Sequence, residues 1–262
     1  MSALVTTPRF IFFTDFDGTI TTDDCNDYLV DNLGFGSERR RQLQKEVLCD
    51  RMSFRDSFLE MFNSITAPYN ECLDILRQNI KFDSDFREFY DWTQQNNIPI
   101  VILSSGTQHM IRTLLDAHLG PDWDIQIVSN EAVPRDGKNI NEQGGWKIEF
   151  HDDSHHGHDK SLEIRKYSSL PSRPVLLYAG DGISDLSAAK ETDLLFAKAN
   201  RDKLCPHLIR AKALSSCTDL SSWCGKEKLP FVAFDNWNHI LQTCKDIVAG
   251  VTTVHEVTKN HS

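Results

Sequence analysis

Short apolar runs recur along this chain of 262 residues, and each run is nearly continuous rather than alternating with polar positions. Such runs are typical of parallel strands that helices cover on both faces. Helical periodicity fills most of the intervals between them, so we expect an α/β fold with a doubly wound parallel sheet. The predicted strands are residues 9–14, 99–103, 174–179, 194–197 and 229–234.

Helices are predicted where apolar positions recur three and four residues apart. They comprise residues 108–119, 161–167, 185–191 and 237–248. Two further strands, 125–128 and 146–150, resemble a side hairpin, with Asp136-Gly137 marking a turn between them.

The interval between the first two strands is far longer than a crossover with its helix requires. Because residues 23–88 carry helical periodicity, we predict a small helical cap there, inserted into an α/β core made of residues 1–22 and 89–262. An apolar stripe in the cap has helical spacing, and such stripes are more often packing than a ligand pocket. Its members are Phe54, Phe58, Met61, Phe62 and Ile65.

Composition narrows the function classes. Hydrophobic residues make up 40% and charged residues 25%, which excludes a disordered or collagen-like chain. Lys and Arg number 28 against 38 Asp and Glu, a net charge of −10, so we expect neither nucleic-acid nor membrane binding. Seven scattered cysteines without a C-x-x-C pair, and a first segment unlike a secretory signal, predict a reduced, cytoplasmic protein. We separately expect a monomer or a weak dimer.

Two carboxylates, Asp15 and Asp17, directly follow the first predicted strand and precede Gly18. In an extended segment, residues two apart face the same side, so both side chains would project at the edge where α/β sheets bind ligands. The alternative is an acidic turn in which an aspartate caps a helix.

Three other polar features lie at strand ends or helix starts. Ser104, Ser105 and Gly106 follow the second strand, and free amides at a helix start suit phosphate, although they also suit an ordinary cap. Lys160 begins a helix and would add a positive charge, although a single Lys is usually exposed. Gly180-Asp181-Gly182-Ile183-Ser184-Asp185 ends the third strand with two more carboxylates, each a candidate cap.

Together, these residues resemble the four motifs of the haloacid dehalogenase superfamily in order and spacing: DFDGT, a Ser, a Lys, and GDGISD. The helical insertion is similar to that of the phosphoserine-phosphatase-like branch. The segments DFDGTITTDDCNDYLVDNLGFG, SSG, GHDKS and GDGISDLSAAKETDLLFAK resemble, more narrowly, the fungal polyol phosphatases, which hydrolyse sugar-alcohol phosphates.

The resemblance implies a Mg²⁺-dependent phosphatase. It makes Asp15 the nucleophile that forms an aspartyl-phosphate, and Asp17 the general acid and base. The implied metal ligands are the Asp15 and Asp181 carboxylates and the Asp17 backbone carbonyl, with Asp185 orienting them. Phosphate contacts are implied for Ser104, the amides near Ser105 and Gly106, and Lys160.

The resemblance leaves the phosphate ester open. Phosphoserine phosphatases carry a Glu where this chain has Asp24, and an Arg where our alignment has Leu59, which disfavours an amino-acid phosphate. Asp24, Asn26 and Asp27 are candidates for contacts to a polyol, or for ordinary roles at a helix start.

The alternatives are a phosphoserine phosphatase, the methionine-salvage phosphatase of a methylthio-ketopentenyl phosphate, a mutase or phosphotransferase, and a non-catalytic sugar-phosphate sensor. Residues 155–158 contain three histidines without the ligand spacing of a structural zinc site, and we expect them to form the loop before Lys160.

Overall fold

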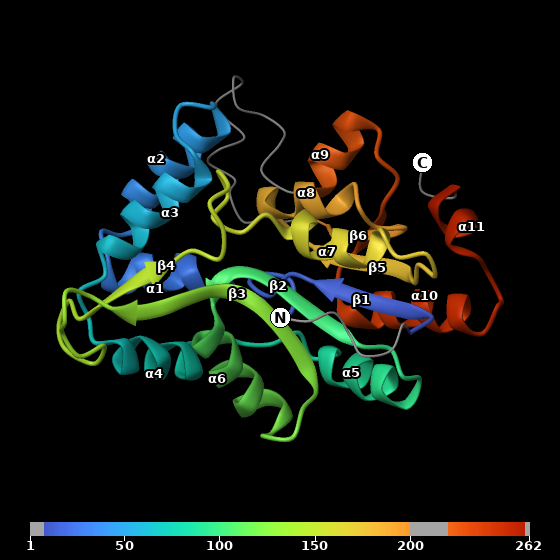
Figure 1. Cartoon of the computed structure of the whole chain (residues 1–262), viewed down its shortest axis with the longest axis horizontal. Helices are drawn as coiled ribbons and strands as arrows, with labels where there is room; N and C mark the ends of the chain where they lie inside the picture. The colour runs from blue at the N-terminus through green and yellow to red at the C-terminus, as the bar shows by residue number, and fades with distance from the viewer. Residues whose placement is uncertain (1–7, 200–219, 260–262) are drawn as a thin grey trace. The chain divides into compact units, whose positions relative to one another are not determined.

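The computed structural model describes residues 8–199 and 220–259 (Figure 1). The chain forms two compact units. Unit 1 contains Met1–Asp15, Asp83–Val101 and Lys160–Ser262, and unit 2 contains Phe16–Phe82 and Ile102–Asp159. Among the described residues, no helix combines the length and apolar character needed to cross a bilayer. Cys205 and Cys217 lie outside the described residues, and the other five cysteines are free thiols.

In the described part of unit 1, four strands lie parallel to their neighbours: β1 (Phe10–Thr14), β5 (Val175–Gly180), β6 (Leu194–Lys198) and β7 (Val232–Phe234). Its helices are α5 (Phe86–Gln95), α7 (Lys160–Ser168), α8 (Leu186–Ala189), α9 (Leu220–Glu227), α10 (Trp237–Val248) and α11 (Val254–Lys259). A single 3₁₀ turn, η1 (Ile183–Asp185), precedes α8.

Helices cover both faces of this part of the sheet. Phe12 and Phe13 are successive residues of β1, so their side chains point to opposite faces. The Phe12 ring packs on Phe89 of α5 and Trp237 of α10, with ring centroids 4.7 and 5.8 Å away. The Phe13 ring packs on Tyr167 of α7 at 5.6 Å. All five residues of β1 are buried, which is why its sequence is a continuous apolar run.

Unit 2 contains the helices that follow β1 in the chain: α1 (Cys25–Leu33), α2 (Ser37–Leu48), α3 (Phe54–Asn63) and α4 (Tyr69–Asn79). It also contains α6 (Gln108–Leu119), β3 (Ile125–Pro134) and β4 (Trp146–Glu149). β3 and β4 are antiparallel, and Asp136 and Gly137 both have positive φ in the connection, which confirms the predicted hairpin and turn.

The apolar stripe of α3 is packing, as predicted. Phe58, Met61 and Phe62 are buried, and the Phe62 ring lies 5.7 Å from the Trp146 ring of β4. The Trp146 indole N–H has a hydrogen-bond acceptor within this core, because it donates to the Ala67 carbonyl at 3.0 Å.

β2 (Ile100–Thr107) begins in unit 1 and continues in unit 2, and the strand order of the seven-stranded sheet is β4-β3-β2-β1-β5-β6-β7. The predicted α/β class is confirmed. Three boundaries were wrong by several residues: β2 continues through the predicted hydroxyl turn to Thr107, β3 continues past residue 128 to Pro134, and β7 begins only at Val232. Pro230 lacks an N–H for a ladder hydrogen bond, which accounts for the late start of β7.

Candidate active site

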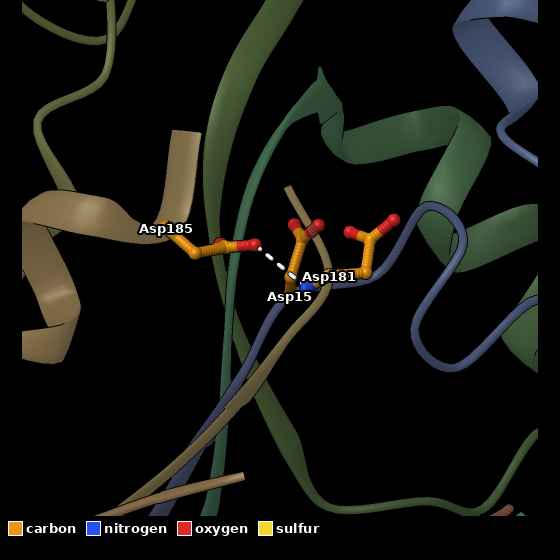
Figure 2. Close-up of side chains that lie close together, drawn as sticks. All are labelled: Asp15, Asp181 and Asp185. Carbon is orange, nitrogen blue, oxygen red and sulfur yellow. Dashed lines mark hydrogen bonds between the residues drawn. The ribbon is translucent and has the colours of Figure 1, made fainter. Parts of the chain in front are cut away.

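Three carboxylates of unit 1 gather where β1 and β5 end (Figure 2). Asp15 follows β1, Asp181 follows β5, and Asp185 closes η1. One carboxylate oxygen from each lies within 4.8 Å of the others, and all three residues are buried. In Figure 2 the Asp15 and Asp181 carboxylates point to the same side of the strand ends, and the Asp185 carboxylate extends toward them.

Strand register brings these residues together. Thr14 pairs with Ala179, so the next residues of the parallel strands reach the same edge, and the Asp15 N–H donates to the Ala179 carbonyl at 2.9 Å. Gly180 then leaves room for Asp185. A Cβ at position 180 would lie 2.6 Å from the Asp185 Cγ, so this position requires glycine.

Lys160 links two of the carboxylates. Its side chain is fully buried, and Nζ donates to Asp15 Oδ1 and Asp185 Oδ1, each at 2.7 Å. Burial alone would lower the pKa of Lys160, but the carboxylates of Asp15 and Asp185 raise it above the ordinary value. The Lys160 ammonium group is therefore held charged. Its bonds to Asp15 and Asp185 use two of the three ammonium hydrogens.

Asp185 accepts hydrogen bonds on both oxygens. Oδ1 accepts from Lys160 Nζ and from the Tyr178 hydroxyl, and Oδ2 accepts from the Asp181 and Gly182 amides at 2.9 and 3.0 Å. Asp185 is the N-cap residue of α8, as the predicted alternative had it, but its side chain accepts no hydrogen bond from that helix. Four donors occupy the usual acceptor positions of a carboxylate, so Asp185 is suited to orienting its neighbours.

Asp17 belongs to unit 2 and is 6% exposed. Its Oδ1 accepts from the Cys25 amide at 3.2 Å, and its Oδ2 accepts from Asn26 Nδ2 at 3.0 Å and from Ser104 Oγ at 3.2 Å. Burial, followed by the nearby charge of Asp24, raises the pKa of Asp17 to about 6, although these hydrogen bonds oppose the shift. A carboxyl group with this pKa exchanges protons readily near neutral pH.

Residues 104–106, the segment predicted to contact phosphate, lie at the end of β2. The Gly106 amide donates to Ser104 Oγ at 2.9 Å, so a phosphate oxygen would have to share or replace that acceptor. The Ser105 side chain is 8% exposed, and its Oγ has no hydrogen-bond partner among the described residues. Ser105 therefore offers a polar atom for which the described part of the chain supplies no partner.

The sequence pattern of the haloacid dehalogenase-like hydrolases matches residues 12–190, which include both carboxylate groups, the Ser-Gly segment and Lys160. The chain belongs to this family. Among haloacid dehalogenase-like hydrolases, the Polyol phosphate phosphatase PYP1 of Saccharomyces cerevisiae is 42% identical over 262 residues, covering 96% of this chain and 99% of the relative.

A second relative and a solved structure extend the comparison. Pdp3-interacting factor 1 of Schizosaccharomyces pombe is 44% identical over 232 residues, or 87% of this chain and 91% of the relative. The structure of a phospho-aspartyl intermediate analogue of phosphoserine phosphatase superposes with a TM-score of 0.61 at 17% identity, covering 91% and 99% of the two chains. This likeness shows the fold. Family and relatives together confirm that the chain is a phosphoric monoester hydrolase.

The cluster at the β1 and β5 ends fits the divalent cation that haloacid dehalogenase-like hydrolases use. Its donors are all oxygen atoms, which Mg²⁺ prefers. Three buried carboxylate groups gather around one ammonium group, and a divalent cation would add positive charge that this cluster lacks. Asp15 and Asp181 are the carboxylates suited to hold it, because the oxygens of Asp185 already accept from four donors.

Two residues that the sequence analysis did not assign hold the Ser-Gly segment. His158 is fully buried, and its Nδ1 lies 3.0 Å from the Ser104 carbonyl, which can only accept, so Nδ1 carries the proton. Asn130 of β3 donates from Nδ2 to the Ser105 carbonyl at 2.6 Å. In the sequence, the one signal for Asn130 is that a polar residue lies just beyond the predicted strand 125–128, where β3 continues.

The three candidate specificity residues differ in what they contact. Asp24 caps α1, accepting from the amides of Asn26 and Asp27 at 2.8 and 2.9 Å. Asp27 forms an ion pair with Arg40 at 2.6 Å. Asn26 is buried and donates to Asp17. Asp24 and Asp27 thus have structural roles, and Asn26 is the one of the three in direct contact with Asp17.

Proposed function

We propose that the chain is a Mg²⁺-dependent phosphatase that hydrolyses small polyol or sugar phosphate monoesters through an aspartyl-phosphate on Asp15. The observation that carries this proposal is the buried group of Asp15, Asp181 and Asp185 around Lys160. Its catalytic residues are Asp15 and Asp17. A bound Mg²⁺ would supply positive charge that lets an anionic carboxylate approach an anionic phosphate. Its ligands would be the carboxylates of Asp15 and Asp181 and the backbone carbonyl of Asp17.

Asp15 acts as the nucleophile in this proposal. Lys160 Nζ holds Asp15 Oδ1, so the other oxygen has a defined direction in which to attack phosphorus. The same ammonium group stabilises negative charge on the phosphoryl oxygens with its third hydrogen, together with Ser104 and the amides of Ser105 and Gly106. Asp185 fixes Lys160 from the far side.

Asp17 acts as the general acid that protonates the departing ester oxygen, and then as the base that accepts a proton from the attacking water. Three hydrogen bonds fix its carboxyl group, and a pKa of about 6 suits both directions of proton transfer. Enzymes that cleave carbon–halogen bonds have no ester oxygen to protonate. A positioned carboxyl group at residue 17 therefore supports phosphoester chemistry.

The comparisons favour a polyol or sugar phosphate as the substrate class. The yeast relative, which is 42% identical over nearly the full length, is named a polyol phosphate phosphatase. We also propose that the protein acts in the cytoplasm as a monomer or weak dimer, and that residues 23–88 form the cap that selects the substrate. The helices α1 to α4 occupy most of that interval.

A phosphate-release assay tests the proposed function. Ribitol, sorbitol, glycerol, erythrose and serine phosphates are compared with and without Mg²⁺. We expect turnover that requires Mg²⁺, with polyol and sugar phosphates preferred over serine phosphate. Asp15→Asn is expected to lower kcat by about 10⁴-fold or more, while the melting temperature shows that the variant folds.

The exposed Asp91→Asn is the matched control for Asp15→Asn and is expected to keep normal turnover. Hydrolysis without any divalent cation, or near-normal turnover by Asp15→Asn, would refute the proposed mechanism. A preference for serine phosphate, or for the methylthio-ketopentenyl phosphate of methionine salvage, would refute the proposed substrate class and leave the chemistry intact.

A further inference from the structure

Three side-chain oxygens converge beside Gly106 in unit 2. A Cβ placed on Gly106 would lie 3.0 Å from Asp17 Oδ2, 3.2 Å from Ser104 Oγ and 3.6 Å from Asn26 Oδ1. Ser104 and Asn26 are nine-tenths or more buried, as is Asp17. A side chain at position 106 would therefore press against these polar atoms, and glycine lets the backbone lie close to them.

The orientation of the Asn26 amide follows from its partner. Nδ2 lies 3.0 Å from Asp17 Oδ2 and donates to it, and the same oxygen also accepts from Ser104 Oγ at 3.2 Å. The donor end of the amide must therefore face Asp17. The acceptor atom, Oδ1, is bonded to the same amide carbon as Nδ2 and therefore points away from Asp17 Oδ2.

Asn26 Oδ1 has no hydrogen-bond partner among the described residues, although Asn26 is only 4% exposed. A buried acceptor without a partner destabilises the folded state, and folded proteins contain few of them. At the neighbouring residues, Asp24 Oδ1 accepts from the amides at the start of α1, and Asp27 Oδ2 pairs with Arg40. An acceptor beside the general acid is thus left for a donor that the ligand brings.

We propose that Asn26 Oδ1 accepts a hydrogen bond from the leaving group, namely from a hydroxyl on the carbon next to the one that bears the phosphate. This inference rests on the proposed function, in which Asp17 protonates the ester oxygen. Because Asn26 contacts Asp17 through the other atom of the same amide, the group that Oδ1 binds must be a close neighbour of that ester oxygen. In a polyol phosphate, this neighbour is the hydroxyl of the adjacent carbon.

Paired substrates that differ by this one hydroxyl test the inference. Glycerol 3-phosphate is compared with 1,3-propanediol phosphate, and ribitol 5-phosphate with its 4-deoxy analogue. The wild-type enzyme should favour the hydroxylated member by about 10-fold in kcat/KM, the usual effect of one hydrogen bond. In Asn26→Ala this ratio should fall to about 1.

The ratio separates two roles of Asn26. Loss of the Asn26–Asp17 bond lowers kcat/KM for both substrates of a pair equally, so it cancels in the ratio. Loss of the Oδ1 contact lowers kcat/KM only for the hydroxylated substrate, so it changes the ratio. Asn26→Leu, which keeps the branched shape and the number of side-chain heavy atoms, is made alongside in case the alanine variant folds poorly. The exposed Asn32→Ala on the same helix is the control and should keep the wild-type ratio.

Equal kcat/KM within each pair for the wild-type enzyme, or an unchanged ratio in Asn26→Ala, would overturn the inference while leaving the phosphatase proposal standing. Absence of hydrolysis of every ester in the panel would overturn the proposed function and, with it, this inference. A ratio that falls only when Asn26 is replaced supports Asn26 as the specificity-determining residue.

Discussion

At the scale of single residues, Asp185 is a buried carboxylate whose two oxygens both accept hydrogen bonds from the protein. Its four hydrogen bonds hold Lys160 and Tyr178 on one oxygen and the amides of Asp181 and Gly182 on the other. Desolvation by burial, followed by the charge of Asp185, raises the pKa of Tyr178 well above its ordinary value, so the tyrosine remains a hydrogen-bond donor.

Asp185→Asn is expected to weaken Mg²⁺ binding by about 10–100-fold, the usual effect of removing a residue that orients metal ligands. An amide places an NH₂ group against donors on one side, so either Lys160 and Tyr178 or the two backbone amides lose their acceptor. Titration calorimetry with Mg²⁺ measures the change, and Asp91→Asn serves again as the exposed control. An unaltered affinity in Asp185→Asn would show that the orientation of Asp181 does not depend on this carboxylate.

At the scale of elements, the end of β2 depends on contacts from β3 and from the loop before α7. Asn130 of β3 accepts from the His151 amide at 2.8 Å and donates to the Ser105 carbonyl at 2.6 Å. His158 bonds to the neighbouring Ser104 carbonyl. With both carbonyls bound in this way, the backbone of residues 104–106 is fixed, which is what precise placement of phosphate contacts requires.

Asn130→Ala is expected to lower kcat by about 10- to 100-fold, because small displacements of positioning groups carry costs of this size. Asn130→Asp keeps the acceptor for His151 but loses the donor to Ser105, so it should be nearly as slow as the alanine variant. The exposed Asn96→Ala is the control. Full kcat in Asn130→Asp would mean that the bond to Ser105 plays no part in catalysis, whatever the stability of the variants.

Elements with strong periodicity could be predicted from the sequence. Helices 108–119 and 237–248 have the predicted bounds, and the predicted strand at residues 9–14 differs from β1 by one residue. The end of β2 could not be predicted, because Ser104 and Ser105 look like a turn. Their carbonyls are bound by side chains from distant segments, a tertiary effect that local patterns do not contain.

Candidate site residues were predictable where a motif and a strand end coincide, as at Asp15 and Asp181. The roles of Asp24 and Asp27 were ambiguous, because an aspartate at a helix start serves equally as a cap or as a ligand contact. The structure gives these two a cap and an ion pair. The contact of Asn26 with Asp17 required the fold of residues 16–26, which no spacing rule specifies.

At the scale of the whole molecule, the net charge of −10 makes the surroundings of the site unfavourable for a phosphate dianion. Binding of a phosphate must therefore depend on local positive charge and hydrogen-bond donors. Lys160 supplies such a positive charge in unit 1. We infer that the cation has two roles, since it would balance the buried carboxylates and also attract the substrate. The proposed mechanism thus combines covalent chemistry at one carboxylate with dependence on a divalent cation.

The most direct test of that account is whether Asp15 carries a phosphoryl group during turnover. Wild-type enzyme and Asp17→Asn are mixed with ribitol 5-phosphate and Mg²⁺ and quenched in acid, and the peptide containing Asp15 is examined by mass spectrometry. We predict one added phosphoryl group on Asp15, removable by hydroxylamine and accumulating in Asp17→Asn, where the base for hydrolysis is missing. Continued turnover with no phosphorylated Asp15 in either protein would contradict the account.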